Sequence, residues 1–335
     1  MEIEKLHAMA KKLVTPGKGI LAADQSPSTM NRQLAAIGVA EEAEMRRQYR
    51  QLLFTTEGIE QHVTGVIMHD GTIRNQTDDG TPFVDVLVGR GIVPIIKVDK
   101  STVSLDGFPG EVVTEGLDGL AKRFAEYYQM GARAAKWRAV ITIGDGLPSE
   151  ECIKINALML ARYARLAQEA NIVPMIEPEV IFAGGHDLAT AERVTKLTLQ
   201  IVFTVLEQYR VDLSGVILKT SMVLAGSEHP EVTTPEAVAD ATIRTLKAAV
   251  PETVPGIVFL SGGQTPERVS ANLNAIATQE KATGGLPWEL AFSFSRGIEQ
   301  PVQEAWRGDT ANNAAAQQVL RETLARNAAA DKGEL

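Results

Sequence analysis

The sequence predicts a single α/β domain built as a (β/α)₈ barrel, in which parallel strands and helices alternate around a closed sheet. Eight short apolar runs recur at intervals of roughly 30 to 45 residues, the spacing of successive strand–helix units. Helical patterns separate many of these runs, and such alternation indicates a parallel sheet. No run carries the Gly-x-Gly-x-x-Gly motif of a dinucleotide site, which disfavours an open, doubly wound sheet.

Each apolar run ends in polar or Gly-rich residues, as expected where a strand leaves the sheet. The predicted strands cover residues 20–24, 66–70, 93–99, 134–138, 173–179, 216–219, 257–263 and 290–296. The predicted helices between them cover residues 117–130, 153–170, 188–209, 235–249 and 266–278. Thr234 and Thr265 each precede a proline at the start of a helical pattern, and this pair of residue types marks a helix N-terminus.

The chain of 335 residues is long enough for two domains, but α/β barrels reach this size as one, and no low-complexity linker divides the sequence. We therefore predict one domain over residues 1–335, with the barrel at about 20–300. An amphipathic helix is expected before the barrel, over residues 1–14. A tail at about 310–335 is expected to hold one helix, over 315–326, followed by a loose end.

Composition excludes several classes of partner and site. The net charge of −9 disfavours nucleic acid, because proteins that bind it present a basic face. No apolar run approaches the ~20 residues that cross a bilayer, and Glu2, Glu4 and Lys5 are atypical of a signal peptide, so we expect no membrane contact. The single Cys152 excludes an intramolecular disulfide and indicates a reducing cytoplasm. The five histidines lack His-x-x-x-His spacing, so no metal is expected.

The sixth predicted strand is buried on both faces and ends in a lysine, Lys219. Desolvation lowers the pKa of a lysine, and an uncharged amine attacks carbonyl groups to form a Schiff base. For this strand alone, a side chain that reaches solvent is the simpler interpretation. Charged residues also end other predicted strands, and barrel enzymes bind their substrates at these strand ends. Together these observations favour a functional role for Lys219.

Three pairs of charged residues lie two positions apart and therefore share a face of their strand. They are Lys97 with Asp99, Lys136 with Arg138, and Glu177 with Glu179. Any one pair is explained by a structural ion pair, but three lysines and several carboxylates, Asp24 included, at one barrel mouth indicate a catalytic site. Close ammonium groups are expected to lower each other's pKa, and a carboxylate is expected to accept the proton.

A second set of residues, after the seventh and eighth predicted strands, indicates a phosphate site. Its members are Ser261, Gly262, Gly263, Ser295 and Arg296. Barrels often bind phosphate between these two loops, where glycines leave backbone N–H groups uncovered. A Gly-Gly pair by itself more often marks a turn, and the facing arginine strengthens the prediction. Lys97 and Arg138, on the opposite side, are candidates for a second phosphate.

Beyond these physical arguments, the order of the motifs resembles a known family, the class I (Schiff-base-forming) fructose-1,6-bisphosphate aldolases. The matching segments are residues 17–24, 78–80, 97–100, 116–120, 135–138, 177–179, 218–219 and 260–264. The resemblance extends from residue 6 to about residue 303. It implies a TIM barrel and an aldehyde-lyase that reversibly cleaves fructose 1,6-bisphosphate to dihydroxyacetone phosphate and glyceraldehyde 3-phosphate, in glycolysis or gluconeogenesis. It also implies a homo-oligomer, usually a tetramer, without a cofactor.

The resemblance assigns a role to each residue of the predicted catalytic set. Lys219 would form the Schiff base, and Glu177 would be the general acid and base for dehydration and proton transfer. Glu179 would tune the lysine. Asp24 and Lys136 would orient and deprotonate the sugar hydroxyl whose collapse breaks the carbon–carbon bond.

The phosphate-binding residues follow from the resemblance in the same way. Ser261, Gly262 and Arg296 would bind one phosphate, while Lys97 and Arg138 would help to bind the other. Sedoheptulose 1,7-bisphosphate and fructose 1-phosphate remain possible alternative substrates.

Two departures from the family pattern affect these expectations. Thr29 stands where many relatives have a phosphate-binding serine, and Gln33 replaces a phosphate-binding arginine, with Arg32 one place early. Many animal and plant members end in a tyrosine that reaches the site, whereas the last tyrosine here is Tyr209. We therefore expect the enamine to be protonated by Glu177 or by water, and we expect the tail to be dispensable for cleavage.

Two other classes of function stay open on the sequence. Another Schiff-base barrel enzyme, such as a transaldolase or a deoxyribose-phosphate aldolase, would share the lysine, but two basic phosphate sites favour a bisphosphate substrate. A barrel kept as a non-enzymatic scaffold would not need three lysines in one mouth.

Overall fold

Eight parallel strands in the order β1-β2-β3-β6-β7-β8-β9-β10 form the central sheet of the computed structural model, which describes residues 2–335. They are β1 (Gly19–Ala23), β2 (Val63–Met68), β3 (Val93–Lys97), β6 (Ala134–Ile141), β7 (Val173–Val180), β8 (Ile217–Thr220), β9 (Gly256–Phe259) and β10 (Glu289–Phe292). The sheet curves into a nearly closed barrel, and the N–H of Ala22 donates to the carbonyl of Phe294 at 3.1 Å where its ends meet. The predicted fold is confirmed.

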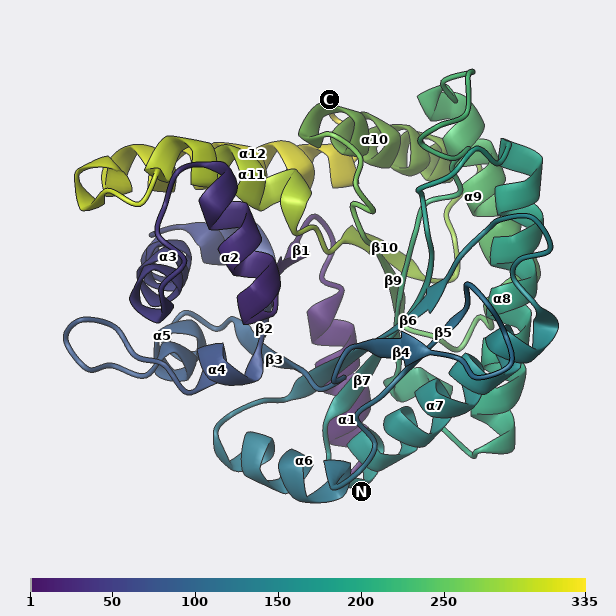
Figure 1. Ribbon diagram of the computed structural model, residues 1–335, viewed down its shortest axis with the longest axis horizontal. Helices are drawn as coiled ribbons and strands as arrows, with labels where there is room; N and C mark the ends of the chain where they lie inside the picture. The colour runs from purple at the N-terminus through teal and green to yellow at the C-terminus, as the bar shows by residue number, and fades with distance from the viewer. Residues whose placement is uncertain (1) are drawn as a thin grey trace.

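Helices lie around the outer face of this barrel and, in the case of α1, across one of its ends (Figure 1). They are α1 (Ile3–Leu13), α2 (Pro27–Ala36), α3 (Ala43–Thr55), α4 (Asp70–Ile73), α5 (Phe83–Gly89), α6 (Leu120–Gln129), α7 (Glu150–Glu169), α8 (Leu188–Gln208), α9 (Pro235–Ala249), α10 (Pro266–Ala282), α11 (Arg296–Trp306) and α12 (Asn313–Asp331). Three single 3₁₀ turns, at Ile59–Gln61, Leu213–Gly215 and Thr310–Asn312, connect elements. The side chains of Thr234 and Thr265 accept the predicted capping hydrogen bonds at α9 and α10.

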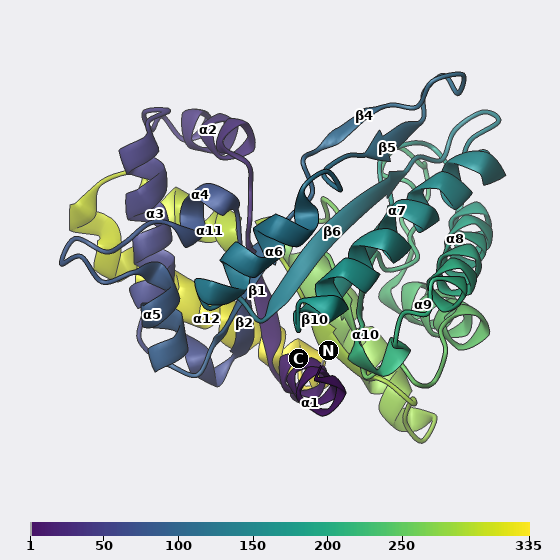
Figure 2. The same ribbon diagram turned by 90° about the horizontal axis from the view of Figure 1, so that it is seen from below.

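The two ends of the barrel differ in what covers them (Figure 2). Helix α1 lies across the amino ends of the strands, where Leu6, Ala10 and Leu13 pack against the apolar barrel interior. At the carboxyl ends, the segment after β3 forms a small antiparallel hairpin of β4 (Thr102–Ser104) and β5 (Val112–Thr114), which the sequence did not predict. The floor is thus closed by apolar side chains, and the opposite end remains accessible.

Strand alternation explains why charge appears only near the mouth. In β8, Ile217 belongs to the interior apolar cluster, and Lys219 follows two residues later on the same face. In β7, Met175 lies in that cluster and Glu177 comes next on its face. Both strands therefore carry an apolar residue in the barrel interior and a charged residue two positions closer to the mouth.

The C-terminal tail packs against the domain, so the predicted loose end is wrong. Helix α12 continues to Asp331, and Ala330 is fully buried. Asn327 is also buried, and its Oδ1 accepts a hydrogen bond of 2.9 Å from the hydroxyl of Ser270 on α10. The alanine-rich composition hid this contact, because small residues give weak periodicity while allowing close helix packing. Within residues 2–335, no helix combines the length and hydropathy needed to cross a membrane.

Candidate active site

A cavity of about 300 Å³ opens at the carboxyl ends of the barrel strands. Twelve of the thirteen predicted site residues line it. They are Asp24, Thr29, Lys97, Lys136, Arg138, Glu177, Glu179, Lys219, Ser261, Gly262, Ser295 and Arg296. Gly263 is outside the lining and lies beneath Arg296, where an added Cβ would come within 3.2 Å of a guanidinium nitrogen. The structure therefore brings residues from distant parts of the chain to one mouth.

Lys219 is buried in the wall of this cavity, with 3% of its surface exposed. Its Nζ lies 3.2 Å from Oε1 of Glu177 on the neighbouring strand β7. The side chain therefore does not reach solvent as an ordinary strand-end lysine would. A buried amine that faces both a cavity and a carboxylate is arranged for nucleophilic attack with proton transfer nearby.

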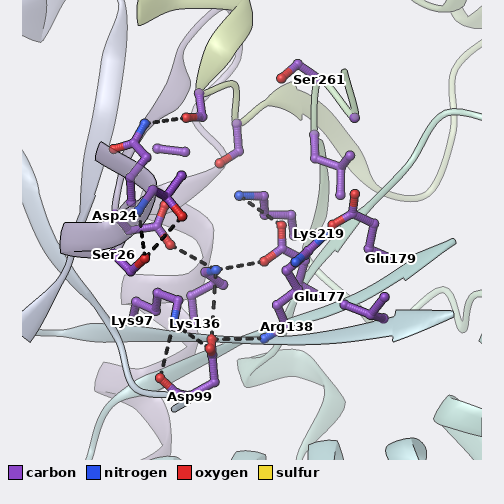
Figure 3. A pocket seen from close by; sticks show the side chains of 18 of the residues that line it. Asp24, Ser26, Lys97, Asp99, Lys136, Arg138, Glu177, Glu179, Lys219 and Ser261 are labelled. Atoms are coloured by element: carbon purple, nitrogen blue, oxygen red, sulfur yellow. Dashed lines mark hydrogen bonds and ion pairs between the residues drawn. The ribbon is translucent and has the colours of Figure 1, made fainter. Parts of the chain in front are cut away.

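Lys136 is the centre of the charged network (Figure 3). Its Nζ lies 2.9 Å from Oδ2 of Asp24, 2.9 Å from Oε2 of Glu177 and 4.0 Å from Oδ2 of Asp99. The contact with Glu177 is an ion pair whose angles fall outside hydrogen-bond geometry, so this oxygen keeps a lone pair for a further proton. Lys136 thereby joins strands β1, β3 and β7 through their carboxylates.

The pKa of Lys136 is opposite to the sequence-based expectation. Burial would lower this pKa, but attraction to Asp24, Glu177 and Asp99 outweighs burial and raises it. Lys136 is consequently a cation at neutral pH. The expectation that neighbouring ammonium groups lower each other's pKa is wrong for this residue, because the carboxylates around it dominate.

The two carboxylates nearest Lys136 are held in the ionised form. Burial would raise the pKa of Asp24, but attraction to Lys136 and Lys219 lowers it. Burial likewise opposes ionisation of Glu177, and Lys136, Lys219 and Arg138 together lower its pKa. Both groups can therefore accept a proton from a bound molecule, with Lys136 compensating the charge.

A second tier of ion pairs lies nearer the opening. The Nζ of Lys97 lies 2.5 Å from Oδ1 of Asp99, and Arg138 donates through Nε to Glu179. Glu179 was expected to tune Lys219, but within residues 2–335 its ion pair is with Arg138. Both candidates for the second phosphate thus already have a carboxylate partner, although each also lines the cavity.

The opposite wall, after β9 and β10, carries donors without ion pairs. Gly262 and Gly263 have φ angles of 59° and 96°, a left-handed conformation that glycine adopts without strain. Arg296 is exposed and opens helix α11, and no salt bridge to it exists within the described residues. The first N–H groups of a helix lack acceptors one turn earlier, so Arg296 places its guanidinium and the start of α11 at the cavity wall. This geometry is suited to a phosphate.

Helix α2, where the sequence departs from the family pattern at Thr29 and Gln33, presents no positively charged side chain to the cavity. Thr29 lines the cavity, and its hydroxyl accepts a hydrogen bond of 3.1 Å from Ser26. Gln33 accepts instead from Gln303 on α11, and Arg32 is exposed. Neither Gln33 nor Arg32 lines the cavity.

Several lining residues had no assigned role on the sequence, among them Gln25 and Ser293. Gln25 contacts the buried pair of Arg50 and Glu299, from helices α3 and α11. Neither helix was predicted, so no signal pointed to this cluster. His69, at the end of β2, accepts from the N–H of Gly71 and caps α4, and residues 2–335 contain no group of three potential metal ligands.

The fold and this mouth together define a (β/α)₈ barrel that gathers lysines and carboxylates around one cavity. Residues 5–335 match the family model described as fructose-bisphosphate aldolase class-I. The chain belongs to this family of lyases.

Individual relatives agree over nearly their whole length. A "Probable fructose-bisphosphate aldolase class 1" of Xanthomonas axonopodis pv. citri is 48% identical over 335 residues, covering 100% of this chain and 99% of that protein. The "Fructose-bisphosphate aldolase, cytoplasmic isozyme 2" of Pisum sativum is 45% identical and covers 98% and 91%. The structure of fructose-bisphosphate aldolase from Plasmodium falciparum, in complex with TRAP and an inhibitor, superposes with a TM-score of 0.96 at 41% identity, covering 99% and 95%.

Proposed function

We propose that the protein cleaves fructose 1,6-bisphosphate reversibly through a Schiff base on Lys219. The observation that carries this proposal is the buried amine of Lys219, which lies 3.2 Å from a carboxylate that also contacts Lys136. Such a pair supplies both the nucleophile and the group that moves protons during imine formation.

Imine formation begins with attack of the Lys219 nitrogen on the C2 carbonyl of the ketose. Starting from the Lys219 ammonium, one proton passes to Glu177 and frees the attacking amine, and a second passes from the nitrogen to the former carbonyl oxygen. Glu177 then gives its proton to the resulting hydroxyl, so that water leaves and a protonated imine remains. Lys136 stays cationic through this step and stabilises the ionised form of Glu177. Glu179 pairs with Arg138, which supports a structural role for Glu179 and not direct tuning of the lysine.

Cleavage then requires a base at the C4 hydroxyl and a sink for the bonding electrons. Asp24, kept ionised by Lys136, accepts the hydroxyl proton as the bond between C3 and C4 breaks. The electron pair enters the protonated imine and gives an enamine, and the aldehyde product leaves. Tyr209 follows helix α8 outside the cavity lining, so we assign protonation of the enamine to Glu177 or water.

The phosphate groups would bind at two unequal sites. The first consists of Ser261, Gly262, Ser295 and Arg296, none of which donates to a carboxylate within residues 2–335. The second contains Lys97 and Arg138, which are already paired with Asp99 and Glu179, so a phosphate there would compete with these carboxylates. This inequality supports a tight site for the phosphate of the ketone half and a weaker site for the other.

The wider setting is also a proposal. We infer sugar phosphates as substrates, action in glycolysis or gluconeogenesis, and a homotetramer in the cytoplasm. The resemblance to the aldolase family supports these inferences, and one similar plant protein is named a cytoplasmic isozyme. No nucleic acid or membrane partner is proposed.

The test is a coupled assay of triose phosphate release from fructose 1,6-bisphosphate, with and without EDTA. The proposal requires saturable cleavage that EDTA leaves unchanged, because lysine and carboxylates carry the reaction. Parallel assays with fructose 1-phosphate and sedoheptulose 1,7-bisphosphate rank the substrates. Cleavage of deoxyribose 5-phosphate in place of the bisphosphate would instead identify another Schiff-base aldolase.

A further inference from the structure

Behind the predicted phosphate site lies a buried polar cluster that the proposed reaction does not use. Arg50 on α3 and Glu299 on α11 are 3% and 1% exposed, and their ion pair measures 3.1 Å between Nη1 and Oε2. Gln25, two residues past the end of β1, bridges this pair to the cavity. Its Nε2 donates to Oε1 of Glu299 at 2.8 Å and to the hydroxyl oxygen of Ser295 at 2.6 Å, while its Oε1 accepts from Arg50.

This cluster fixes the direction of the Gln25 amide. A guanidinium can only donate, so the atom that faces Arg50 must be the amide oxygen. The amide nitrogen then faces Glu299, both of whose carboxylate oxygens meet donors. Rotating the amide by half a turn would place its donor against Arg50 and its acceptor against Glu299, two buried groups for which a lost partner is costly.

The direction of the amide determines in turn what Ser295 can do. A serine hydroxyl has one proton to donate and two lone pairs to accept. Because Gln25 donates to the oxygen of Ser295, the serine proton cannot point at Gln25 and is available for another acceptor. Ser295 lines the same cavity as Arg296 and Ser261. Its hydroxyl proton can therefore point into the cavity, toward a bound anion.

We propose that Gln25 is a positioning residue, which the buried Arg50–Glu299 pair orients so that the Ser295 hydroxyl donates to a bound phosphate. The inference rests on the proposed function insofar as the ligand is the phosphate of a sugar phosphate. A purely structural Gln25 would fill the space between helix α11 and strand β1 without affecting anion affinity. The two roles differ in one property, the direction of the hydrogen bond at Ser295.

Exchanging the two side chains tests this direction directly. The double variant Gln25→Glu/Glu299→Gln keeps the net charge. Both Nη1 and Nη2 of Arg50 still face a side-chain oxygen, from position 299 and position 25 respectively. The new carboxylate at position 25 can only accept, so it takes the Ser295 proton away from the ligand. We expect the KM for fructose 1,6-bisphosphate and the Kd for inorganic phosphate, from calorimetry, each to rise about tenfold, with kcat changed less than about threefold.

A matched control exists on the outer face of the same helix. There Gln300 donates to Glu304 at 3.1 Å, and both side chains face solvent. The exchange Gln300→Glu/Glu304→Gln makes the same chemical change without touching Ser295, and it should leave the phosphate Kd as in the parent protein. Equal thermal unfolding midpoints for the two double variants will show that both fold.

A cycle with Ser295→Ala completes the test. Removing the hydroxyl should weaken phosphate binding about tenfold in the parent and less than about twofold in the exchanged background. Equal costs in both backgrounds, or an exchanged variant that binds phosphate as the parent does, would overturn the proposal. If the exchange prevents folding, Ser295→Ala alone decides, because an unchanged Kd rules the donor out. Failure of the proposed function would show as absence of cleavage by the parent protein. The Kd for inorganic phosphate can be measured independently of cleavage, so the two failures are distinguishable.

Discussion

The two walls of the cavity differ in whether their cations are paired with carboxylates of the protein. On the wall of β6, β7 and β8, Lys136 and Lys219 are buried and each lies against a carboxylate within the protein. On the wall after β9 and β10, Arg296 is exposed and has no ion pair within residues 2–335. Burying a charge without a partner costs several kcal/mol, whereas a guanidinium in contact with water needs no partner until a ligand binds. The first wall therefore contains its own counter-charges, and the second is completed by the ligand.

The contrast predicts different consequences of mutation. A change on the paired wall leaves a buried charge uncompensated and should reduce both kcat and stability. A change on the unpaired wall should reduce affinity and leave stability nearly intact.

The largest effect is expected for Lys219→Arg. Arginine keeps a positive charge beside Glu177 but remains protonated, so it cannot condense with a ketone. We expect kcat to fall by at least about 10⁴-fold in the coupled assay, since removal of a catalytic nucleophile has effects of this size. Lys281→Arg, at an exposed position of α10, is the control. Retention of more than a tenth of the parent kcat would show that Lys219 is not the nucleophile.

Lys136→Met should come next and should affect two properties at once. Without this cation Asp24 and Glu177 lose their shared partner, and we expect kcat to fall about 10²- to 10³-fold. The free energy of unfolding in urea should decrease by about 3–5 kcal/mol, because a buried pair has been broken. Adding Asp24→Asn should recover part of the stability but no activity. A single variant with parent stability would contradict the paired-wall description.

Arg296→Ala tests the other wall. The loss of charge-assisted hydrogen bonds to phosphate should raise KM roughly 10- to 100-fold. The unfolding free energy should stay within about 0.5 kcal/mol of the parent, as is usual for an exposed side chain. Arg326→Ala, at an exposed position of α12, serves as the control for loss of an exposed arginine. A large loss of stability would mean that Arg296 is held by the protein and not reserved for ligand.

The smallest effect concerns Asp331, a half-buried carboxylate that forms no salt bridge within residues 2–335. Burial and the nearby charge of Glu289 raise the pKa of Asp331 well above its ordinary value, and its Oδ2 has no hydrogen-bond partner in residues 2–335. The folded state then binds the proton more tightly than the unfolded state, so the stability from this group falls as pH rises above about 4. Asp331→Asn should therefore raise the unfolding midpoint at pH 7.5. The difference should close as pH approaches about 4, and a constant difference would exclude titration of Asp331 as its cause.

Sequence patterns located the paired wall because its residues follow from strand alternation. Lys136 and Arg138, or Glu177 and Glu179, share a face by their spacing alone. Which carboxylate pairs with which cation depends on how neighbouring strands are staggered, and single-strand patterns do not contain that information. The pairing of Glu179 with Arg138 was missed for this reason.

Helix α3 and the cluster at Gln25 were not predicted, for a different reason. Helix α3 is rich in charged residues, and one of them, Arg50, is buried, so hydrophobic periodicity underestimates its buried face. Its partner Glu299 lies 249 positions away. Such a contact is defined by the tertiary fold and leaves no local pattern in the chain.

The account depends most on the identity of the amine that condenses with substrate. Incubation with dihydroxyacetone phosphate and borohydride, followed by digestion and mass spectrometry, locates the reduced adduct on a single peptide. The account predicts one stoichiometric label on Lys219 and none in the Lys219→Arg variant. A label on Lys136 or Lys97, or an active protein that is never labelled, would contradict it.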